Sequence, residues 1–384
     1  MPNSRVLKIG IVAGEASGDV LGAGLIKSLK QLYPNCEVVG VGGDHLIAQG
    51  TQSLVDINEL SVMGLVEVVK HLPRLLSIRK QIVNYFIENP PDVYIGVDAP
   101  DFNLPVAKKL KAHGIKTIHY VSPTIWAWRE SRIHKIAAAT NLVLGIFPFE
   151  QAIYDKYQVP YQYVGHTLAD TIALEVDREQ PRLELGMARD EHVLAILPGS
   201  RAKEIASMLP VFLQAASLYA QHQDNKLHVL IPAANKARLV QIEALLAELK
   251  PDFRLTVTQR PARDVMIASD VVLLTSGTAS LEAMLCKRPM VVAYKMSGLT
   301  YLIMQRLYKP DYFALPNILA GQALVPELLQ EQVNPANLCQ NLLEQLQRNQ
   351  DLLLYAYREQ HLRLKQGADE QAAKAVLALI ESHS

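Results

Sequence analysis

Cysteine is scarce in this chain: its 384 residues include three, Cys36, Cys286 and Cys339, and no Cys-x-x-Cys pair. This spacing excludes a disulfide framework and a zinc knuckle, so we expect reduced cysteines that fill small spaces in the core. No apolar run reaches the ~18–20 residues of a membrane-spanning helix. Segment 6–13 is strand-like where a secretory signal would need a longer apolar region and a cleavage site, so we expect a cytoplasmic protein.

An excess of either charge is also missing. Lys and Arg together number 38, and so do Asp and Glu, so no overall field attracts a polyanion and nucleic acid is not an expected partner. No Asp-x-Asp pair occurs and no two histidines stand three or four residues apart, so we predict no metal site. The absence of Gly-x-Ser-x-Gly argues against a serine hydrolase.

The chain has instead a long alternation of strand-like and helix-like segments. Its length exceeds the ~250–300 residues at which one core stops growing, so two domains are expected. The strands are predicted at 6–13, 37–42, 92–97, 116–121, 142–146, 161–164, 193–197, 227–231, 253–257, 271–274 and 290–293. Helical patterns fill most of the gaps, which predicts parallel strands with right-handed crossovers.

A charged stretch that ends in proline, 175–181, interrupts the alternation and is interpreted as a linker. It separates a first domain, 1–175, from a second, 182–350. The chain after Pro335 is predicted to be helical. We therefore expect two doubly wound, Rossmann-like α/β domains that face a cleft.

Two carboxylates follow the apolar run 93–97, which is typical of a buried parallel strand. In open α/β sheets, ligands bind beyond the carboxyl ends of the strands. Asp98 is therefore a candidate general base, and at this point Asp101 is an equal candidate.

The segment 14–19, Gly-Glu-Ala-Ser-Gly-Asp, follows the first strand and begins a helix. Glycine lets the backbone turn tightly, and the first N–H groups of a helix can bind an anion or a hydroxyl-rich ring. The segment is neither Gly-x-Gly-x-x-Gly nor Walker A. Ser17 or Asp19 could equally be a plain helix cap, whereas Glu15 precedes any plausible cap.

The second half repeats this arrangement at two strand ends. Arg201, in Leu-Pro-Gly-Ser-Arg, can donate two hydrogen bonds to a phosphate, although an exposed loop arginine is the alternative. The turn 275–278 offers hydroxyls and N–H groups to a pyrophosphate. Glu282, one turn into the next helix, could accept hydrogen bonds from a ribose diol.

Segment 62–80 combines dense apolar residues with basic ones. Such a mixture can lie on an anionic bilayer or hold acyl chains, and a core helix with solvated basic residues explains it equally well. We expect Pro73 to divide it into two segments.

Taken together, the motifs closely resemble the lipid-A-disaccharide synthase family, inverting glycosyltransferases of the B fold. The resemblance extends nearly from end to end, through 13–19, 62–68, 98–103, 120–129, 197–201, 276–279 and 315–321. The family transfers a 2,3-diacylglucosamine unit from its UDP derivative to 2,3-diacylglucosamine 1-phosphate, forms a β-1,6 linkage and releases UDP. It implies no cofactor.

The resemblance implies that Asp98 is the base, since a strand-end carboxylate could take the proton of an attacking sugar hydroxyl. The substrate-binding residues it implies are Glu15, Ser17, Gly18, Asp19, Asn103, Gly199, Ser200, Arg201, Ser276, Gly277, Thr278, Glu282 and Asn317. The residues expected to contact acyl chains or an anionic membrane surface are Val62, Met63, Leu65, Val66, Val69, Lys70 and Arg74.

The resemblance also implies that a C-terminal helix, about 365–384, packs on the first domain. The expected location is peripheral, on the inner face of the inner membrane. A homodimer is possible. Two other functions stay open as well: a UDP-sugar 2-epimerase of the same fold, and a non-catalytic nucleotide-sugar sensor.

Overall fold

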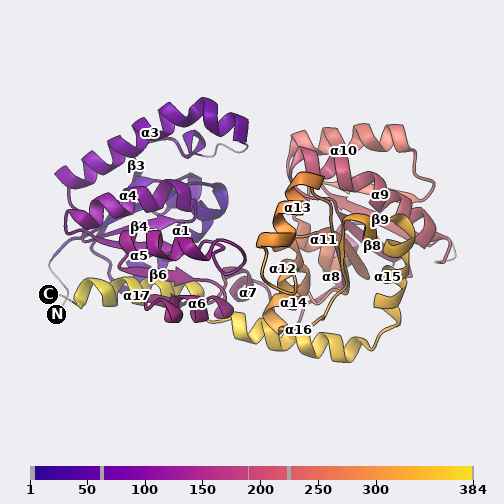
Figure 1. The fold of residues 1–384 in the computed structure, drawn as a ribbon. Coiled ribbons are helices and arrows are strands. Elements are labelled where there is room, and N and C mark those ends of the chain that lie inside the picture. Colours follow the sequence, from indigo (N-terminus) through magenta and orange to yellow (C-terminus); the bar gives the residue numbers. More distant parts are fainter. Residues whose placement is uncertain (1–4, 61–64, 189, 223–225, 383–384) are drawn as a thin grey trace. The chain divides into compact units, whose positions relative to one another are not determined.

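The structure is a computed structural model that describes residues 5–60, 65–188, 190–222 and 226–382, without the side chains of 65–71 and 299. The chain divides into two compact units, residues 1–170 with 364–384 and residues 171–363. Each unit contains one parallel sheet with helices on its faces (Figure 1). The prediction of two doubly wound α/β domains is confirmed.

The sheet of the first unit has the strand order β3-β2-β1-β4-β5-β6-β7. Its strands are β1 (Leu7–Ala13), β2 (Cys36–Val41), β3 (Thr51–Ser53), β4 (Val93–Val97), β5 (Lys116–Tyr120), β6 (Leu142–Gly145) and β7 (Tyr161–Tyr163). The chain builds outward from β1 in one direction and from β4 in the other. The topological switch point, where ligands bind in such sheets, therefore lies between β1 and β4.

Helices cover both faces of this sheet. They are α1 (Ala16–Leu32), α2 (Asp44–Ala48), α3 (Leu65–Glu88), α4 (Pro100–Ala112), α5 (Ile133–Ala139), α6 (Gln151–Lys156), α7 (Thr167–Thr171) and α17 (Ala368–Glu381). Short 3₁₀ helices lie at η1 (Ile57–Glu59), η2 (Glu130–Arg132) and η3 (Pro148–Glu150). One core cluster joins Leu25 of α1 and Val376 of α17 to the sheet, and another joins Phe86 of α3 and Leu110 of α4 to it.

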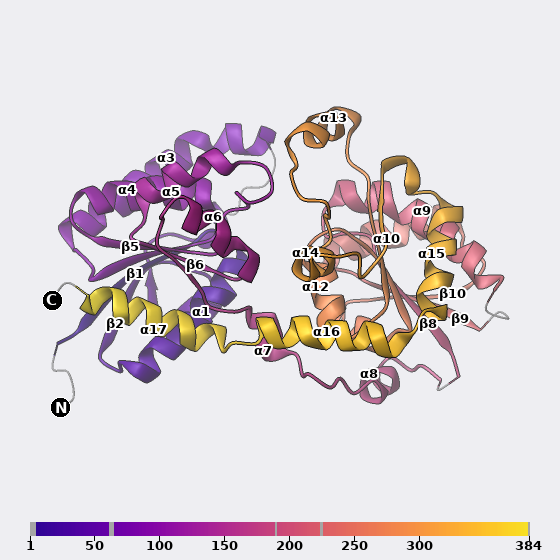
Figure 2. The same ribbon diagram turned by 60° about the horizontal axis from the view of Figure 1, so that its bottom comes forward.

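Helix α17 belongs to the first unit although it ends the described chain. It lies beside α1 (Figure 2, yellow). The Asp170 carboxylate accepts hydrogen bonds from the N–H groups of Gly367 at 2.9 Å and Ala368 at 2.6 Å, at the start of the helix. These bonds satisfy N–H groups that have no partner inside the helix.

The sheet of the second unit has the order β10-β9-β8-β11-β12-β13, with its switch point between β8 and β11. Its strands are β8 (His192–Leu197), β9 (Leu227–Pro232), β10 (Arg254–Thr258), β11 (Val271–Thr275), β12 (Met290–Tyr294) and β13 (Glu327–Leu329). Its helices are α8 (Glu179–Glu184), α9 (Ala202–Ala220), α10 (Lys236–Leu249), α11 (Ala262–Ala268), α12 (Thr278–Leu285), α13 (Gly298–Leu307), α14 (Leu315–Ala320), η4 (Gln330–Gln332), α15 (Pro335–Gln347) and α16 (Gln350–Leu364).

Three details differ from the sequence-based expectations. The prediction that Pro73 divides its segment is wrong, because α3 continues unbroken from Leu65 to Glu88. Pro73 is exposed, so water can satisfy the carbonyl that the missing N–H leaves free. The edge strands β3 and β13, of three residues each, were not predicted. Helix α8 begins inside the stretch interpreted as a linker.

Candidate functional site

The switch point of the first unit brings two turns together. Ala13, the last residue of β1, pairs with Val97, the last residue of β4, so the turns that follow these strands are neighbours. A Cβ atom on Gly14 would lie 2.4 Å from the Cβ of Ala99, which is far inside normal contact. Glycine is required at position 14 because the Ala99 methyl group of the second turn lies so close to it.

Asp98 begins the second of these turns in a strained conformation. Its φ is 52° and that of Ala99 is 42°, both in the left-handed region that costs free energy for residues with a side chain. Strain of this kind is concentrated at functional sites. Burial raises the pKa of the Asp98 carboxyl, and a hydrogen bond from the Ala99 N–H opposes that rise. A raised pKa makes the ionised carboxylate a stronger base.

Asn103 braces this turn from within α4. Its side chain is completely buried, and its Oδ1 accepts a hydrogen bond from the Tyr94 hydroxyl at 3.0 Å. Its Nδ2 lies 2.8 Å from the carbonyl oxygen of Asp98, 3.2 Å from that of Val12 and 3.3 Å from that of Val97. The amide therefore ties the ends of β1 and β4 to the start of the Asp98 turn.

Asp101 has a different environment. Its carboxylate is exposed and forms an ion pair with Arg132, and its carbonyl oxygen accepts a hydrogen bond from Arg79 at 3.0 Å. These contacts anchor the start of α4 at the surface. The two aspartates that follow β4 therefore lie in different environments.

The turn after β1 holds the other expected residues of the first unit. Glu15 precedes α1 and is partly exposed, Ser17 is exposed, and a Cβ on Gly18 would lie 3.4 Å from the carbonyl oxygen of Val97. Glycine at position 18 thus lets α1 pass close to the end of β4.

Asp19 is buried, and its carboxylate accepts hydrogen bonds from the backbone N–H groups of Gly43 at 2.7 Å, His45 at 3.0 Å and Leu46 at 3.1 Å. It therefore caps α2. Beside it lies a cavity of about 570 Å³ whose wall includes Gly42, Gly43 and His45. The sequence analysis missed these three residues, although the strand-end rule applied to β2 would have found them.

The switch point of the second unit carries a cavity of about 560 Å³. Leu197 of β8 pairs with Leu274 of β11, so the turns after these strands are neighbours. The cavity wall contains most of the residues expected to bind a diphosphate: Gly199, Ser200, Arg201, Ser276, Gly277 and Thr278. Residues separated by 75 positions or more in the chain thus meet in one wall.

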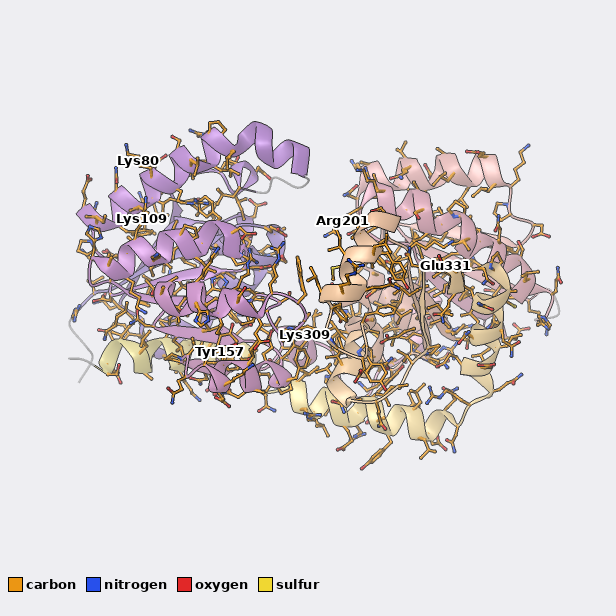
Figure 3. The ribbon with its side chains drawn as sticks, in the orientation of Figure 1. Lys80, Lys109, Tyr157, Arg201, Lys309 and Glu331 are labelled. Atoms are coloured by element: carbon orange, nitrogen blue, oxygen red, sulfur yellow. The ribbon has the colours of Figure 1, made fainter. Side chains whose placement is uncertain are left out.

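The turn before α9 is shaped by Glu204. The Glu204 carboxylate pairs with the Arg201 guanidinium at 2.9 Å and accepts a hydrogen bond from the Arg201 N–H at 3.3 Å. Gly199 has a φ of 106°, and a Cβ there would lie 2.6 Å from Glu204 Oε2. The Arg201 side chain is exposed on the second unit (Figure 3). The cavity therefore has a cation and a helix N-terminus on the same wall.

The opposite parts of this wall were not predicted. They are the segments 232–234 and 259–262, which follow β9 and β10. Both are further strand ends of the same sheet, so the rule that singled out Arg201 applies to them too. The motifs did not single them out, although the segment after β10 contributes Arg260, a second arginine in the wall.

Two expected donor residues lie outside the cavity wall. Glu282 is partly buried on α12, and burial raises the pKa of its carboxyl while Arg263 opposes the rise. Asn317 is buried; its Nδ2 donates to Val325 O at 2.9 Å and to Glu327 Oε1 at 2.8 Å. Its Oδ1 accepts from the N–H groups of Leu324 at 2.8 Å and Val325 at 2.9 Å. Asn317 therefore braces a loop with its whole hydrogen-bonding capacity.

Part of the expected membrane surface lies outside the description. Val62 and Met63 are not among the described residues, and the side chains of Leu65, Val66, Val69 and Lys70 are not described either. Arg74 pairs with Glu59 at 2.5 Å and 2.9 Å. Leu72 and Leu76 are 45% and 48% exposed, and Lys80 also lies on the outer side of α3 (Figure 3). An apolar surface with basic neighbours therefore exists on the described part of α3.

In residues 5–60, 65–188, 190–222 and 226–382, no group of three or more His, Cys, Asp or Glu side chains gathers as a metal site would require. Over the same residues, no helix combines the length and apolar character needed to cross a membrane.

Comparison with known sequences gives a consistent result. A family model described as lipid-A-disaccharide synthetase matches residues 9–380. A lipid-A-disaccharide synthase of Alteromonas mediterranea is 55% identical over 378 residues, which cover 97% of this chain and 98% of the relative. Those of Haemophilus influenzae strain PittEE and Pseudoalteromonas translucida are each 50% identical, with coverage of 97% and 99% of this chain and of 97% and 99% of the relatives.

Solved structures agree on the fold. A UDP-GlcNAc 2-epimerase from Neisseria meningitidis, bound to UDP-GlcNAc, aligns with a TM-score of 0.60 at 13% identity and covers 98% of this chain and 99% of the epimerase. The glycotransferase of kitacinnamycin aligns with a TM-score of 0.62 at 15% identity, covering 97% of this chain and 99% of its own. The same fold thus serves an epimerase and a transferase, and the sequence comparisons distinguish between them.

Proposed function

Because the chain belongs to the lipid-A-disaccharide synthase family, and is therefore a glycosyltransferase, we propose that it joins UDP-2,3-diacylglucosamine to 2,3-diacylglucosamine 1-phosphate. The products are lipid A disaccharide 1-phosphate and UDP. One observation carries the proposal: in each unit, residues of the family motifs meet at the switch point of the sheet, where α/β proteins bind ligands.

The first unit is proposed to be the acceptor domain, with Asp98 as the base. The acceptor hydroxyl attacks the anomeric carbon of the donor, its proton passes to the Asp98 carboxylate, and the bond from that carbon to the UDP oxygen breaks. A single displacement inverts the anomeric configuration. The raised pKa of Asp98 and its strained turn support this role. Glu15, Ser17, Gly18, Asp19 and Asn103 would shape the acceptor site, the last two by bracing its backbone.

The second unit is proposed to be the donor domain. The departing diphosphate carries negative charge, which the N-termini of α9 and α12 and the Arg201 guanidinium would stabilise. Gly199, Ser200, Ser276, Gly277 and Thr278 would supply N–H and hydroxyl groups. Glu282 is proposed to bind the ribose diol, and Asn317 to hold the loop beside it.

Membrane contact is proposed for the outer side of α3. Acylated sugars partition into bilayers, so an enzyme that uses them needs an apolar surface with basic residues near it. Exposed Leu72 and Leu76 beside Arg74 and Lys80 support a peripheral position on the inner face of the inner membrane.

One assay separates the proposal from its alternatives. Purified protein is given acylated or non-acylated UDP-glucosamine with the lipid acceptor, and UDP release and product mass are measured. We expect UDP release and a disaccharide 1-phosphate only with the acylated donor. A C2 epimer of UDP-N-acetylglucosamine formed without acceptor would establish the epimerase instead. Binding of the nucleotide sugar without turnover of any donor would establish a sensor.

A further inference from the structure

The second unit contains another cavity, of about 460 Å³, beneath α13. Aromatic and methionine side chains make most of its wall: Tyr294, Met296, Tyr301, Met304, Tyr308, Tyr312 and Phe313. Its volume lies within the ~300–1,000 Å³ of pockets that bind small molecules. The roles proposed above for the donor domain make no use of it.

Helix α13 roofs this cavity. Tyr301, Met304, Gln305 and Tyr308 all line it, and their spacing of three, four and seven residues places them on one face of the helix. Among the described side chains of α13, none is fully buried. The helix stands away from the sheet (Figure 2). Because most helical stability comes from packing of such a face, an apolar occupant would stabilise α13.

Several polar groups of the wall have hydrogen-bond partners within the unit. The Tyr308 hydroxyl donates to the carbonyl oxygen of Tyr312 at 2.9 Å. The Gln330 side chain accepts from the Met296 N–H at 2.7 Å and donates to its carbonyl oxygen at 3.1 Å. The wall therefore offers rings and thioethers, which adapt to a flexible apolar chain.

This cavity adjoins the donor cavity at one residue that lines both. Ser276 lines both, and its hydroxyl donates to the carbonyl oxygen of Phe313 at 3.4 Å. Burial and the nearby Glu204 carboxylate, which lies in the donor wall, raise the pKa of Tyr294 in the wall beneath α13. A ligand whose diphosphate lies beside Ser276 can extend an apolar part into the cavity beneath α13.

We propose that the cavity beneath α13 receives an acyl chain of the donor sugar. The inference rests on the proposed function, and it assigns donor selection to α13 while leaving membrane contact to α3. Each methylene of the acyl chain that is buried in the cavity should raise the affinity for the donor about fourfold, which corresponds to ~0.8 kcal/mol. A donor without acyl chains would leave the cavity unfilled.

The test uses UDP-diacylglucosamine donors of graded acyl length with the full-length enzyme and its acceptor. Met304→Trp fills the cavity from α13. Ile303→Trp places the same ring on the exposed neighbouring position and is the control. For donors with the longest acyl chains, we expect the kcat/KM of Met304→Trp to fall at least ~10-fold, the loss expected when two buried methylenes are displaced. The acyl length that gives the highest kcat/KM should be shorter than in the wild type. Ile303→Trp should follow the wild type, and UDP affinity should be unchanged in both variants.

A second variant should shift the preferred acyl length in the opposite direction, which a misfolded protein could not do. Met304→Ala enlarges the cavity, so its optimum should move to longer chains. If the Met304 variants transfer acylated donors with the length dependence of the wild type, the cavity proposal is overturned while the synthase function stands. If the wild type transfers no acylated donor at all, the proposed function itself fails.

Discussion

The side-chain amide of Asn103 lies 2.8 Å from the carbonyl oxygen of Asp98, so a completely buried group on α4 holds the start of the strained turn. The same amide reaches the carbonyl oxygens of Val12, next to the end of β1, and Val97, at the end of β4. In the second unit, Asn317 braces a loop with equally complete hydrogen bonding. These two asparagines form a matched pair with different expected effects.

Asn103→Leu should lower kcat by up to ~100-fold, the order expected for a ~1 Å misplacement of the base. Because it leaves buried carbonyl groups without a donor, the free energy of unfolding should fall by about 1–3 kcal/mol. Asn317→Leu should lower stability similarly but raise the KM for the donor. Steady-state kinetics and urea denaturation measure both effects. Identical kinetic changes in the two variants would contradict the assignment of separate roles.

Gly14→Ala should displace the Asp98 turn, because the new Cβ would overlap that of Ala99, 2.4 Å away. Overpacking of this kind costs about 1–3 kcal/mol, and we expect it to appear mainly as lost kcat. The double variant Gly14→Ala with Ala99→Gly exchanges the positions of the methyl group and should recover most of the activity. Glycine also suits the positive φ at position 99. No recovery in the double variant would show that the contact does not set the turn.

Asp98→Asn should abolish disaccharide formation, retain UDP binding and raise the midpoint of thermal unfolding near neutral pH. Burial raises the pKa of Asp98 in the folded protein above its unfolded value. The corresponding stabilisation is present below the unfolded pKa and is lost as pH rises through the folded pKa. Asparagine does not ionise, so the variant does not lose stability as pH rises through the pKa of Asp98. Asparagine also tolerates a positive φ well.

Thermal unfolding of both proteins at about pH 7.5 and about pH 4 checks this sign. The advantage of the variant should shrink at the lower pH. The acid limb of the wild-type kcat profile should lie above the ordinary pKa of an aspartate. A variant with full activity would refute the base assignment.

Arg201→Ala should raise the KM for the donor by about 10- to 100-fold, the range expected for losing a charged hydrogen bond to phosphate. Lys203→Ala, at an exposed position two residues away and outside the cavity wall, is the control of equal charge. Calorimetric titration with UDP gives a second measure. Equal effects of the two substitutions would indicate general charge attraction instead of a specific contact.

Leu72→Ser with Leu76→Ser should reduce binding to vesicles that contain anionic lipid, because the outer side of α3 would lose its apolar contact. The control, Leu183→Ser with Leu352→Ser, changes two leucines that are each 68% exposed in the second unit. Flotation of each variant with vesicles measures the effect. Equal flotation of both variants would exclude α3 as the contact surface.

Much of the fold could be predicted because buried parallel strands leave a strong signal. The runs that form β4, β8 and β11 consist mostly of buried apolar residues, and each ends at a turn with polar residues. The strands β3 and β13 have only three residues each, too few for a periodic pattern to appear. The prediction of a break at Pro73 was wrong because proline is tolerated in a helix where water replaces the missing backbone hydrogen bond.

The polar loops of the candidate site could be predicted from the sequence, and the side chains that hold these loops in place less so. Gly199 and Arg201 stand in a recognisable motif, whereas Arg260, in the cavity wall beyond β10, does not. Asn103 and Asp19 belong to the same motifs as the expected ligands, yet their side chains bind the backbone. Sequence alone does not distinguish a polar group that binds a ligand from one that holds the loop beside it.

The position of α17 has a consequence for synthesis on the ribosome. The core on one face of the first sheet needs Ala372 and Val376, which lie beyond the entire second unit in the chain. Domains generally fold in the order in which they emerge. Here the core of the first unit stays incomplete until α17 has been synthesised. The second unit can complete its core earlier. The first unit, although it is translated first, therefore completes its core last.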